Sequence, residues 1–235
     1  MTPSNVVLCS PVRSAIGTYG GSLKAMPASD LGACVIRAAL ERAALLGSDI
    51  EAVVLGQVVQ AGSKMNPARQ AMIGAGIPEC VPALTVNRVC GSGAQAIVSA
   101  AQEVMLGHIA CAVAGGMENM DQAPYLMSGG RWGYRMGNAQ IYDSMLRDGL
   151  NDAFSDEHSG WHTEDLVTKV QIEREAQDAW AMRTQMRFGE AQAAGRFDAE
   201  IVSIEVPNLK DPLKFKKDEH NRPDTTIQSL AELKP

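Results

Sequence analysis

The sequence has 235 residues, of which 46% are hydrophobic and 20% are charged, and its net charge at pH 7 is −6. This is the composition of a globular protein with enough apolar residues for a sizeable core. The lysines and arginines are dispersed and the apolar runs are too short to span a membrane, so we expect neither a nucleic-acid nor a membrane partner. The N-terminus lacks the charged start and apolar core of a signal peptide, which favours a cytoplasmic location.

The cysteines argue for a reduced protein. There are five of them, an odd number, and no pair has CxxC spacing. A disulfide framework and a zinc site are therefore both poor interpretations. We expect most of these thiols to be small buried apolar groups.

The first part of the chain alternates strand and helix patterns. Apolar residues 6–8 predict a strand, and residues 30–46 predict a helix with Ser29 as N-cap and Gly47 just past its end. A buried strand is expected over 51–60. Asn66 and Pro67 then predict the start of a second helix, with Asn66 as the cap and Pro67 in the first helical position.

The pattern continues with a strand over 84–89, a helix over 93–107 and a strand over 109–116. Such alternation predicts an α/β protein with a mostly parallel sheet. The helix over 93–107 is rich in small residues, and we expect it to be buried on most sides.

The remainder is less regular. Residues 117–160 show no clear periodicity, whereas Thr163 begins a long helical pattern that ends at Gly195. A strand over 199–207, an exposed polar loop over 208–224 and a short helix over 226–235 complete the expected elements.

Cys90 lies between the strand over 84–89 and the helix that follows. The N-terminus of a helix stabilises a thiolate, which is the reactive form of cysteine. Gly91 and Gly93 permit a sharp turn and the close approach of another backbone or a ligand. The residues alone leave two interpretations open, which are a nucleophile on a strained turn and a buried cysteine beside incidental glycines.

Five stretches of the chain form a specific combination: QVVQAG…NPARQA (57–71), TVNRVCGSG (85–93), AGGMENMDQAPY (114–125), GYRMG…DSMLRDGLNDAF (133–154) and RPDTTIQSLAELKP (222–235). In these stretches the chain resembles the thiolases, the coenzyme A-dependent acetyl-CoA acetyltransferases. The resemblance implies an α/β thiolase fold of αβαβα layers, with a mixed sheet in the first half and an inserted loop domain. It implies an N-terminal thiolase half with an incomplete sheet over 1–118, a coenzyme A-binding loop domain over 119–235, and a C-terminal half that is absent from this chain.

The resemblance also implies site residues. Cys90 corresponds to the acyl-accepting cysteine, and His158 to the histidine beside the pantetheine end of the substrate. Ser159 stands where the family commonly has Met, and Glu157 where Tyr is usual, so no acyl-chain length is predicted. Arg222 falls where the family has a basic residue near the nucleotide of coenzyme A, although a solvated loop charge explains it equally well. Met117, in AGGMENM, is placed on the substrate side.

A thiolase makes or cleaves a carbon–carbon bond by Claisen chemistry through an acyl-cysteine. Coenzyme A thioesters are its substrates, and the resemblance implies neither a further cofactor nor a metal. The family's base histidine, second cysteine and enolate-binding asparagine find no match here. We therefore expect a complementary chain that carries the C-terminal half, in a heterotetramer with two copies of each chain.

Other functions stay open. The sequence is alternatively a fragment of a single-chain 3-ketoacyl-CoA thiolase. A decarboxylating or hydroxymethylglutaryl-type condensing enzyme shares the fold and the cysteine nucleophile. A thiolase-like chain that binds coenzyme A without catalysis is the non-enzymatic alternative.

Overall fold

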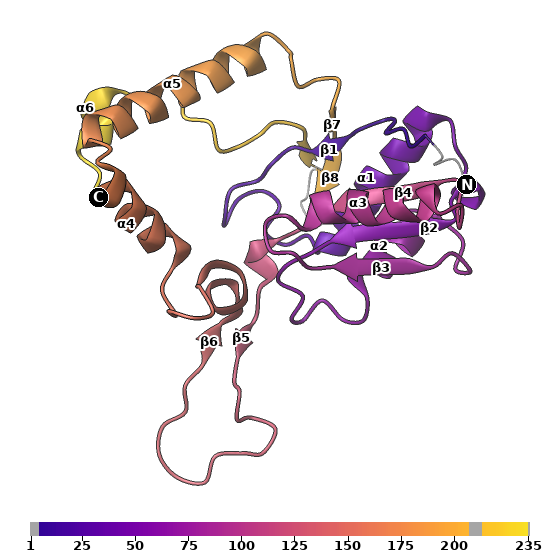
Figure 1. The fold of residues 1–235 in the computed structure, drawn as a ribbon, viewed down its shortest axis with the longest axis horizontal. Helices are drawn as coiled ribbons and strands as arrows, with labels where there is room; N and C mark the ends of the chain where they lie inside the picture. The colour runs from indigo at the N-terminus through magenta and orange to yellow at the C-terminus, as the bar shows by residue number, and fades with distance from the viewer. Residues whose placement is uncertain (1–4, 207–212, 235) are drawn as a thin grey trace.

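The computed structural model describes residues 5–206 and 213–234, and a parallel sheet lies within the body on the right of Figure 1. Its strands are β2 (Ala52–Gly56), β3 (Ala83–Val86) and β4 (Ala112–Gly116), in the order β3-β2-β4. Val54 of β2 is in register with Leu84 and Ala114 of its two neighbours. The predicted α/β alternation and parallel pairing are confirmed, although β2 is shorter than the expected strand over 51–60.

Helices cover both faces of this sheet. Val53 and Leu55 point into a core cluster with α1 (Ala28–Ala43) and α2 (Pro67–Gly74). Val54 points the other way, into a cluster with α3 (Ser92–Met105). Successive residues of a strand face opposite sides, so one continuous apolar strand supplies both cores.

The helix boundaries follow local chemistry. Asn66 caps α2 as predicted, with its side chain accepting a hydrogen bond from the Arg69 amide at 3.3 Å and Pro67 in the first turn. The predicted boundaries of α1 are wrong, because Pro27 precedes the helix and Ala44, at φ 53°, ends it. The fixed φ of proline suits a helix start, and the left-handed Ala44 lets its amide bond back to Glu41 and Leu40. The 3₁₀ turn Gly47–Asp49 follows.

Helix α3 is not buried on most sides, which corrects the expectation for residues 93–107. Its buried residues, Ser92, Ala96 and Ala100, form one stripe at four-residue spacing, whereas Val98 and Met105 are about half exposed. The small residues serve close packing against the sheet on that one face.

The expected strand over 6–8 is also wrong, because no neighbouring backbone in the described ranges pairs with it. Val7 and Leu8 are more than 70% exposed. The strand of this region is β1 (Arg13–Ser14), which pairs in parallel with β7 (Ile201–Val202). An apolar run becomes a strand only where another strand satisfies its backbone.

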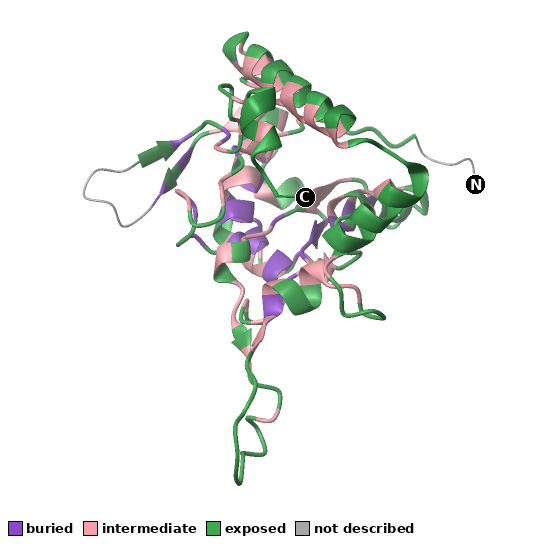
Figure 2. Cartoon of the chain, turned by 90° about the vertical axis from the view of Figure 1, so that its left-hand side faces the viewer, coloured by how far each residue is buried: buried purple, intermediate pink, exposed green. Residues whose placement is uncertain are grey.

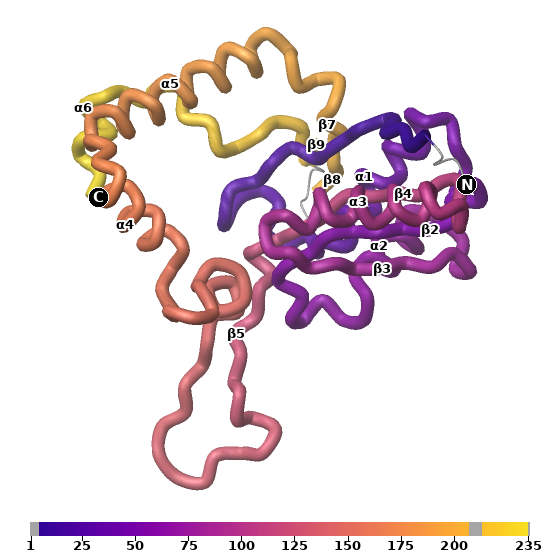
Figure 3. The backbone as a smooth tube through the Cα atoms, in the orientation of Figure 1, coloured from indigo at the N-terminus to yellow at the C-terminus, as the bar shows by residue number. Residues whose placement is uncertain are grey.

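After β4 the chain leaves the sheet and forms an outlying region (Figures 1 and 3). It passes the 3₁₀ turn Met120–Gln122 and the antiparallel pair β5 (Tyr125–Leu126) and β6 (Tyr142–Asp143). The connection between these strands projects from the body and is largely exposed (Figure 2). A π-helical turn, Leu146–Leu150, then leads toward the helices.

The long helix expected over 163–195 is two helices, α4 (Ser159–Val170) and α5 (Arg174–Ala193). Gln171 breaks the pattern, because it adopts a left-handed φ of 56°. Its amide bonds to Thr168 O and the Ile172 amide to Val167 O, which closes the end of α4. The short helix α6 (Ile227–Ala231) lies against α5, as Figure 1 shows.

Between α5 and α6 the chain returns to its own beginning (Figure 3). Strands β8 (Ile204–Val206) and β9 (Leu213–Phe215) form an antiparallel pair. Ile204, Val206 and Phe215 are buried with Ala15, Leu23, Met26 and Leu31 in a cluster of their own. The expected strand over 199–207 is two short strands, β7 and β8. Residue 207 lies outside the described residues. Residues 208–212 of the exposed loop expected over 208–224 also lie outside the described residues; in the remainder Phe215 and Asp218 are buried, which corrects the expectation there.

None of the helices in the described part of the chain is both long and apolar enough to cross a bilayer. The predicted division into residues 1–118 and 119–235 stays a prediction.

Candidate active site

Cys90 lies on the turn between β3 and α3, as predicted. Its side chain is exposed, and Gly91 is the N-cap of the 14-residue helix. The turn follows the carboxyl end of a parallel strand, which is the edge where open α/β sheets bind their ligands. A thiolate at this position faces the positive end of the helix dipole.

The residue before the cysteine is strained. Val89 has a φ of 48°, in the left-handed region, which is a genuine outlier for a β-branched side chain. Such a conformation costs on the order of 1–3 kcal/mol and persists only where the surroundings impose it.

Ser92 supplies one side of that surrounding structure. Its hydroxyl donates to the Val89 carbonyl at 2.6 Å and accepts from the Arg88 amide at 2.8 Å. The Ser92 amide also donates to the Val89 carbonyl, at 3.0 Å. Ser92 is only 4% exposed, so these bonds are shielded from water.

Asn87 supplies the other side. Its Oδ1 accepts from the Val89 amide at 3.0 Å, and its Nδ2 donates to the Val58 carbonyl at 3.3 Å. The side chain therefore links the turn before Cys90 to the segment that follows β2.

Glycines bring the start of α3 close to the ends of two strands. A Cβ on Gly56, the last residue of β2, would lie 2.5 Å from the carbonyl carbon of Ser92 and 2.6 Å from its Cβ. A Cβ on Gly116, the last residue of β4, would lie 3.3 Å from the Cα of Gly93. A Cβ on Gly93 itself would lie 3.9 Å from the Gly115 and Gly116 backbone, an ordinary contact, so the close approach depends on Gly56 and Gly116 and the predicted role of Gly93 stays a prediction.

Glu118 binds the same segment after β2, through the backbone amides of Val58 and Val59. Its Oε2 accepts from the Val58 amide at 2.7 Å and from the Val59 amide at 3.3 Å. Burial raises the pKa of the Glu118 carboxyl, although these two amides and the Gln57 side chain act in the opposite direction. Oε1 of Glu118 and Oε1 of Gln57 are buried and accept no hydrogen bond from the described residues.

The predicted coenzyme A-side residues lie mostly in the outlying region. His158 is the N-cap of α4, where its Nδ1 accepts from the Gly160 amide at 2.9 Å, and the exposed Ser159 is the first helical residue. Arg222 is exposed on the loop before α6. Among the described residues, no hydrogen bond joins Cys90 to any of them. Met117 is 8% exposed and packs in the core against Gly32 of α1. The binding roles of these four residues stay predictions.

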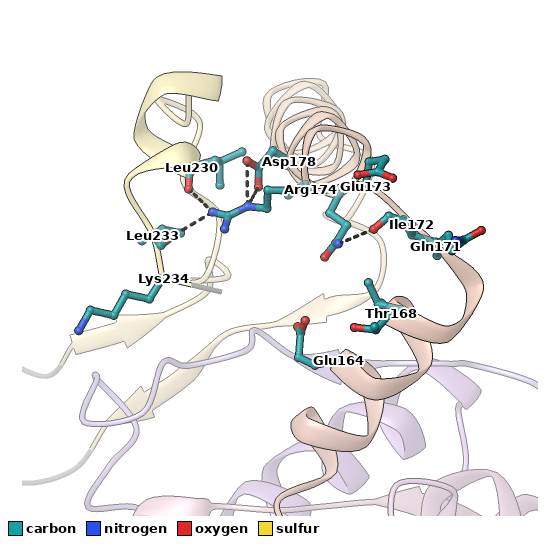
Figure 4. Close-up of a pocket in the computed structure, with 13 residues that line it drawn as sticks. Glu164, Thr168, Gln171, Ile172, Glu173, Arg174, Asp178, Leu230, Leu233 and Lys234 are labelled. Atoms are coloured by element: carbon teal, nitrogen blue, oxygen red, sulfur yellow. Dashed lines mark hydrogen bonds and ion pairs between the residues drawn. The ribbon is translucent and has the colours of Figure 1, made fainter.

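A cavity of about 770 Å³ lies in this outlying region, between the end of α4, the start of α5 and the end of α6 (Figure 4). Arg174 closes one wall, with Nε on Asp178 and Nη2 on the carbonyls of Leu230 and Leu233. A cavity of about 310 Å³ lies beside the start of α1 and is lined in part by Gln57, Ser63 and Asn119. Cys90 lines neither cavity.

One group of side chains has the composition of a metal site. Ligand atoms of Glu157, His162 and Asp165 lie within 4.8 Å of one another, and all three residues are exposed. Exposed acidic groups commonly gather in this way without an ion. His162 Nε2 is in addition 2.9 Å from the hydroxyl of Ser155, so one of its nitrogens is already engaged.

The remaining four cysteines are not mainly buried in the core. All five are unpaired, and Cys9 and Cys80 are exposed, which corrects the expectation that most are buried. Cys34 and Cys111 do pack against core clusters. Burial raises the pKa of the Cys111 thiol, with smaller contributions from Cys9 and nearby carboxylates.

The sequence analysis gave no role to Asn87, Ser92 or Glu118. An asparagine two residues before a strained position is a recognisable signal, because Asn side chains bond to backbone two residues on. The contact of Glu118 with residues 58–59 is non-local and has no such signal.

Comparison with known proteins identifies the family. The model of the thiolase N-terminal domain matches residues 6–235. The chain belongs to the thiolase family. It is 49% identical over 233 residues to a probable acetyl-CoA acyltransferase of Staphylococcus epidermidis and 48% identical over 233 residues to the acetyl-CoA acetyltransferase of Cupriavidus necator. Each alignment covers 99% of this chain and 59% of the relative.

A solved thiolase has the same fold. The crystal structure of the Bacillus anthracis acetyl-CoA acetyltransferase superimposes with a TM-score of 0.92 at 38% identity, over 96% of this chain and 57% of that one. The predicted thiolase fold is thus confirmed. The chain spans about three fifths of the length of these thiolases.

Proposed function

We propose that this chain carries the nucleophile of an acetyl-CoA C-acetyltransferase, with Cys90 accepting the acyl group. The observation that carries the proposal is the exposed thiol on a strained turn at the N-terminus of α3. A strained turn presents the thiol outward, and the helix end stabilises its anion. The names of the relatives agree with this reaction.

In the cleavage direction, the Cys90 thiolate attacks the ketone carbon of a 3-ketoacyl-CoA such as acetoacetyl-CoA. The resulting alkoxide collapses and breaks the carbon–carbon bond, and the acetyl-CoA enolate that leaves takes up a proton. The thiol of coenzyme A then attacks the acyl-cysteine, which gives a new acyl-CoA and regenerates Cys90. The reverse sequence is a Claisen condensation. The Cys90 amide is our candidate donor to a thioester oxygen.

The residues beyond α3 then bind coenzyme A. We assign His158 and Ser159 to the pantetheine end, Arg222 to the nucleotide end and Met117 to the substrate side. His158 is only partly exposed and is fixed as a helix cap, which suits a contact residue of defined orientation. Arg222 is exposed on its loop, and a guanidinium group suits an anionic phosphate, which supports this assignment.

The base histidine, the second cysteine and the enolate-binding asparagine come from the part of a thiolase that this chain does not span. We propose that a complementary chain carries them, in an assembly with two copies of each chain; one longer polypeptide is the alternative. Half-exposed apolar residues on β3 and α3, Leu84, Val98 and Met105, support a neighbouring body that covers this side.

Two rival functions make different predictions. A hydroxymethylglutaryl-type or decarboxylating enzyme would not cleave acetoacetyl-CoA when free coenzyme A is added. A non-catalytic coenzyme A-binding chain would leave Cys90 inert to iodoacetamide in the native assembly.

The test is to incubate the native protein that contains this chain with acetyl-CoA and to locate the acetyl group by peptide mass spectrometry. We expect it on Cys90, and we expect Cys90→Ser to abolish acetyl transfer. Cys80→Ser is the matched control, because Cys80 is also exposed but follows no strand and begins no helix. Acetylation of another cysteine, or turnover retained by Cys90→Ser, would overturn the proposal.

A further inference from the structure

The backbone of Val89 is held at both of its polar groups by side chains that flank Cys90. Asn87 accepts from the Val89 amide, and Ser92 donates to the Val89 carbonyl. A second bond of the Ser92 hydroxyl, from the Arg88 amide, fixes the preceding peptide. The left-handed conformation at φ 48° is thus imposed from both directions.

The side chain of Val89 has little part in holding this conformation. It is 54% exposed, and a valine side chain opposes a positive φ. Because a rotation at Val89 re-aims the next residue, whatever fixes its φ also fixes the direction in which the Cys90 side chain leaves the turn.

We propose that Ser92 and Asn87 are positioning residues for Cys90, which act by holding Val89 in the left-handed conformation. The proposal rests on the proposed role of Cys90 as acyl acceptor. Ser92 has the larger share, because it is 4% exposed, whereas Asn87 is exposed and its bonds compete with water. Gly56 admits this arrangement, since a side chain there would meet Ser92.

The test compares Ser92→Ala and Asn87→Ala in the native protein that contains this chain, with kcat and KM measured for acetoacetyl-CoA cleavage. A misaimed nucleophile lowers kcat, so we expect Ser92→Ala to reduce kcat on the order of tenfold with KM unchanged. Asn87→Ala should reduce it less. Ser99→Ala is the matched control, because Ser99 lies on the same helix and its hydroxyl accepts from Gln95 rather than binding the turn.

The decisive measurement is a double-mutant cycle with Val89→Gly. Glycine adopts a positive φ without steric cost, so the turn then needs less support from Ser92. We expect Ser92→Ala to cost severalfold less kcat when it is combined with Val89→Gly than when it is made in the unaltered protein. Equal losses in the two backgrounds would overturn the proposal, because Ser92 would then act by another route.

Two further readouts separate the possible failures. If Ser92→Ala does not fold, the cycle of Asn87→Ala with Val89→Gly replaces it, and absence of coupling there overturns the proposal. If the unaltered protein carries no acetyl group on Cys90, the proposed function itself has failed. If it does carry one and the variants turn over like the unaltered protein, only the positioning roles have failed.

Discussion

Arg13 and Asp218 stand 205 positions apart in the chain and share two hydrogen bonds, Nη1–Oδ1 at 2.8 Å and Nη2–Oδ2 at 3.0 Å. The Asp218 side chain is 3% exposed, and its Oδ1 also accepts from the Ile16 amide at 2.7 Å. This pair fastens the segment after β9 to the beginning of the chain.

Asp218→Asn should destabilise the fold by about 2 kcal/mol, since it removes the charge that satisfies a partly buried arginine. Burial alone would raise the pKa of Asp218, but the bonds from Arg13 and Ile16 lower it overall. The stabilising contribution is therefore complete above the unfolded pKa of 3.8 and is lost as the pH falls below it. Urea denaturation between pH 3 and pH 7 measures this, with the exposed Asp224→Asn as control. An unchanged midpoint for Asp218→Asn would contradict the prediction.

Glu118→Gln should change stability in the opposite pH direction. Burial raises the pKa of Glu118, so its protonated form favours the folded state below the unfolded pKa of 4.5, and this advantage is lost as the pH rises through the folded value. The amide keeps an oxygen for the Val58 and Val59 amides and does not ionise. We expect the variant to lose part of the fall in stability between pH 5 and pH 8, as measured by urea denaturation. Glu41→Gln, at an exposed site on α1, should leave that fall intact; equal behaviour of the two variants would refute the idea.

Gly56→Ala should be among the most damaging small changes in the chain. Its Cβ would overlap Ser92, so the start of α3 must move, at a cost of about 1–3 kcal/mol. Gly115→Ala is the matched control on the neighbouring strand, where the nearest atom would be Leu55 Cδ2 at 3.9 Å. Thermal melts and iodoacetamide labelling of Cys90 should both change for the first variant and not for the second. Similar melting temperatures would show that the helix start tolerates displacement.

His158 combines a helix cap with a proposed substrate contact, and two substitutions separate these roles. His158→Ala removes both and should destabilise α4 by about 1 kcal/mol, whereas His158→Asn retains a good cap. We expect both variants to raise KM or lower kcat for acetoacetyl-CoA. If His158→Asn had unaltered kinetics, the imidazole would have no part in substrate binding.

The proposed complementary chain predicts the behaviour of this chain in isolation. Expressed alone, it should be poorly soluble or inactive, because apolar residues of β3 and α3 lack a cover among the residues that the structure describes. Coexpression with a chain that carries the remaining thiolase length should restore both solubility and cleavage of acetoacetyl-CoA. Light scattering after size exclusion measures the assembly. A soluble, active, isolated chain would exclude the partner.

The sequence predicted the elements whose signals are local. The alternation through residue 116, the Asn66–Pro67 helix start and the turn at Cys90 all depend on neighbours within a few positions. The failures were non-local. The sequence around Val6 does not indicate whether another strand pairs with it, and none does among the described residues. The sequence around Phe215 does not indicate that this residue is buried in one cluster with Leu23.

The site shows the same division. Cys90 was predicted because the glycines and the helix start are adjacent to it in the sequence. The bonds that Glu118 accepts from the Val58 and Val59 amides depend on strands that meet only in the folded protein. The positive φ of Val89 is held by its near neighbours Asn87 and Ser92, but it opposes the preference of a β-branched residue, so nothing in the sequence indicated it. The hydrophobic periodicity also gave no sign of the break at Gln171. Glutamine is a good helix former, so the sequence does not show that this residue adopts a left-handed conformation.

The pairing of β1 with β7 also sets an order of events during synthesis. Arg13 bonds to Glu200, 187 residues later, and a ribosome takes roughly 10–40 s to add that length. The core around α1, α2 and the central sheet is complete by Met117 and can form in the meantime. Leu23 and Met26 are buried in one cluster with Ile204 and Phe215, so they stay exposed to water until those residues have been synthesised. Residues 13–26 therefore leave the ribosome well before the strands that complete their packing, and a chaperone has that interval in which to act on them.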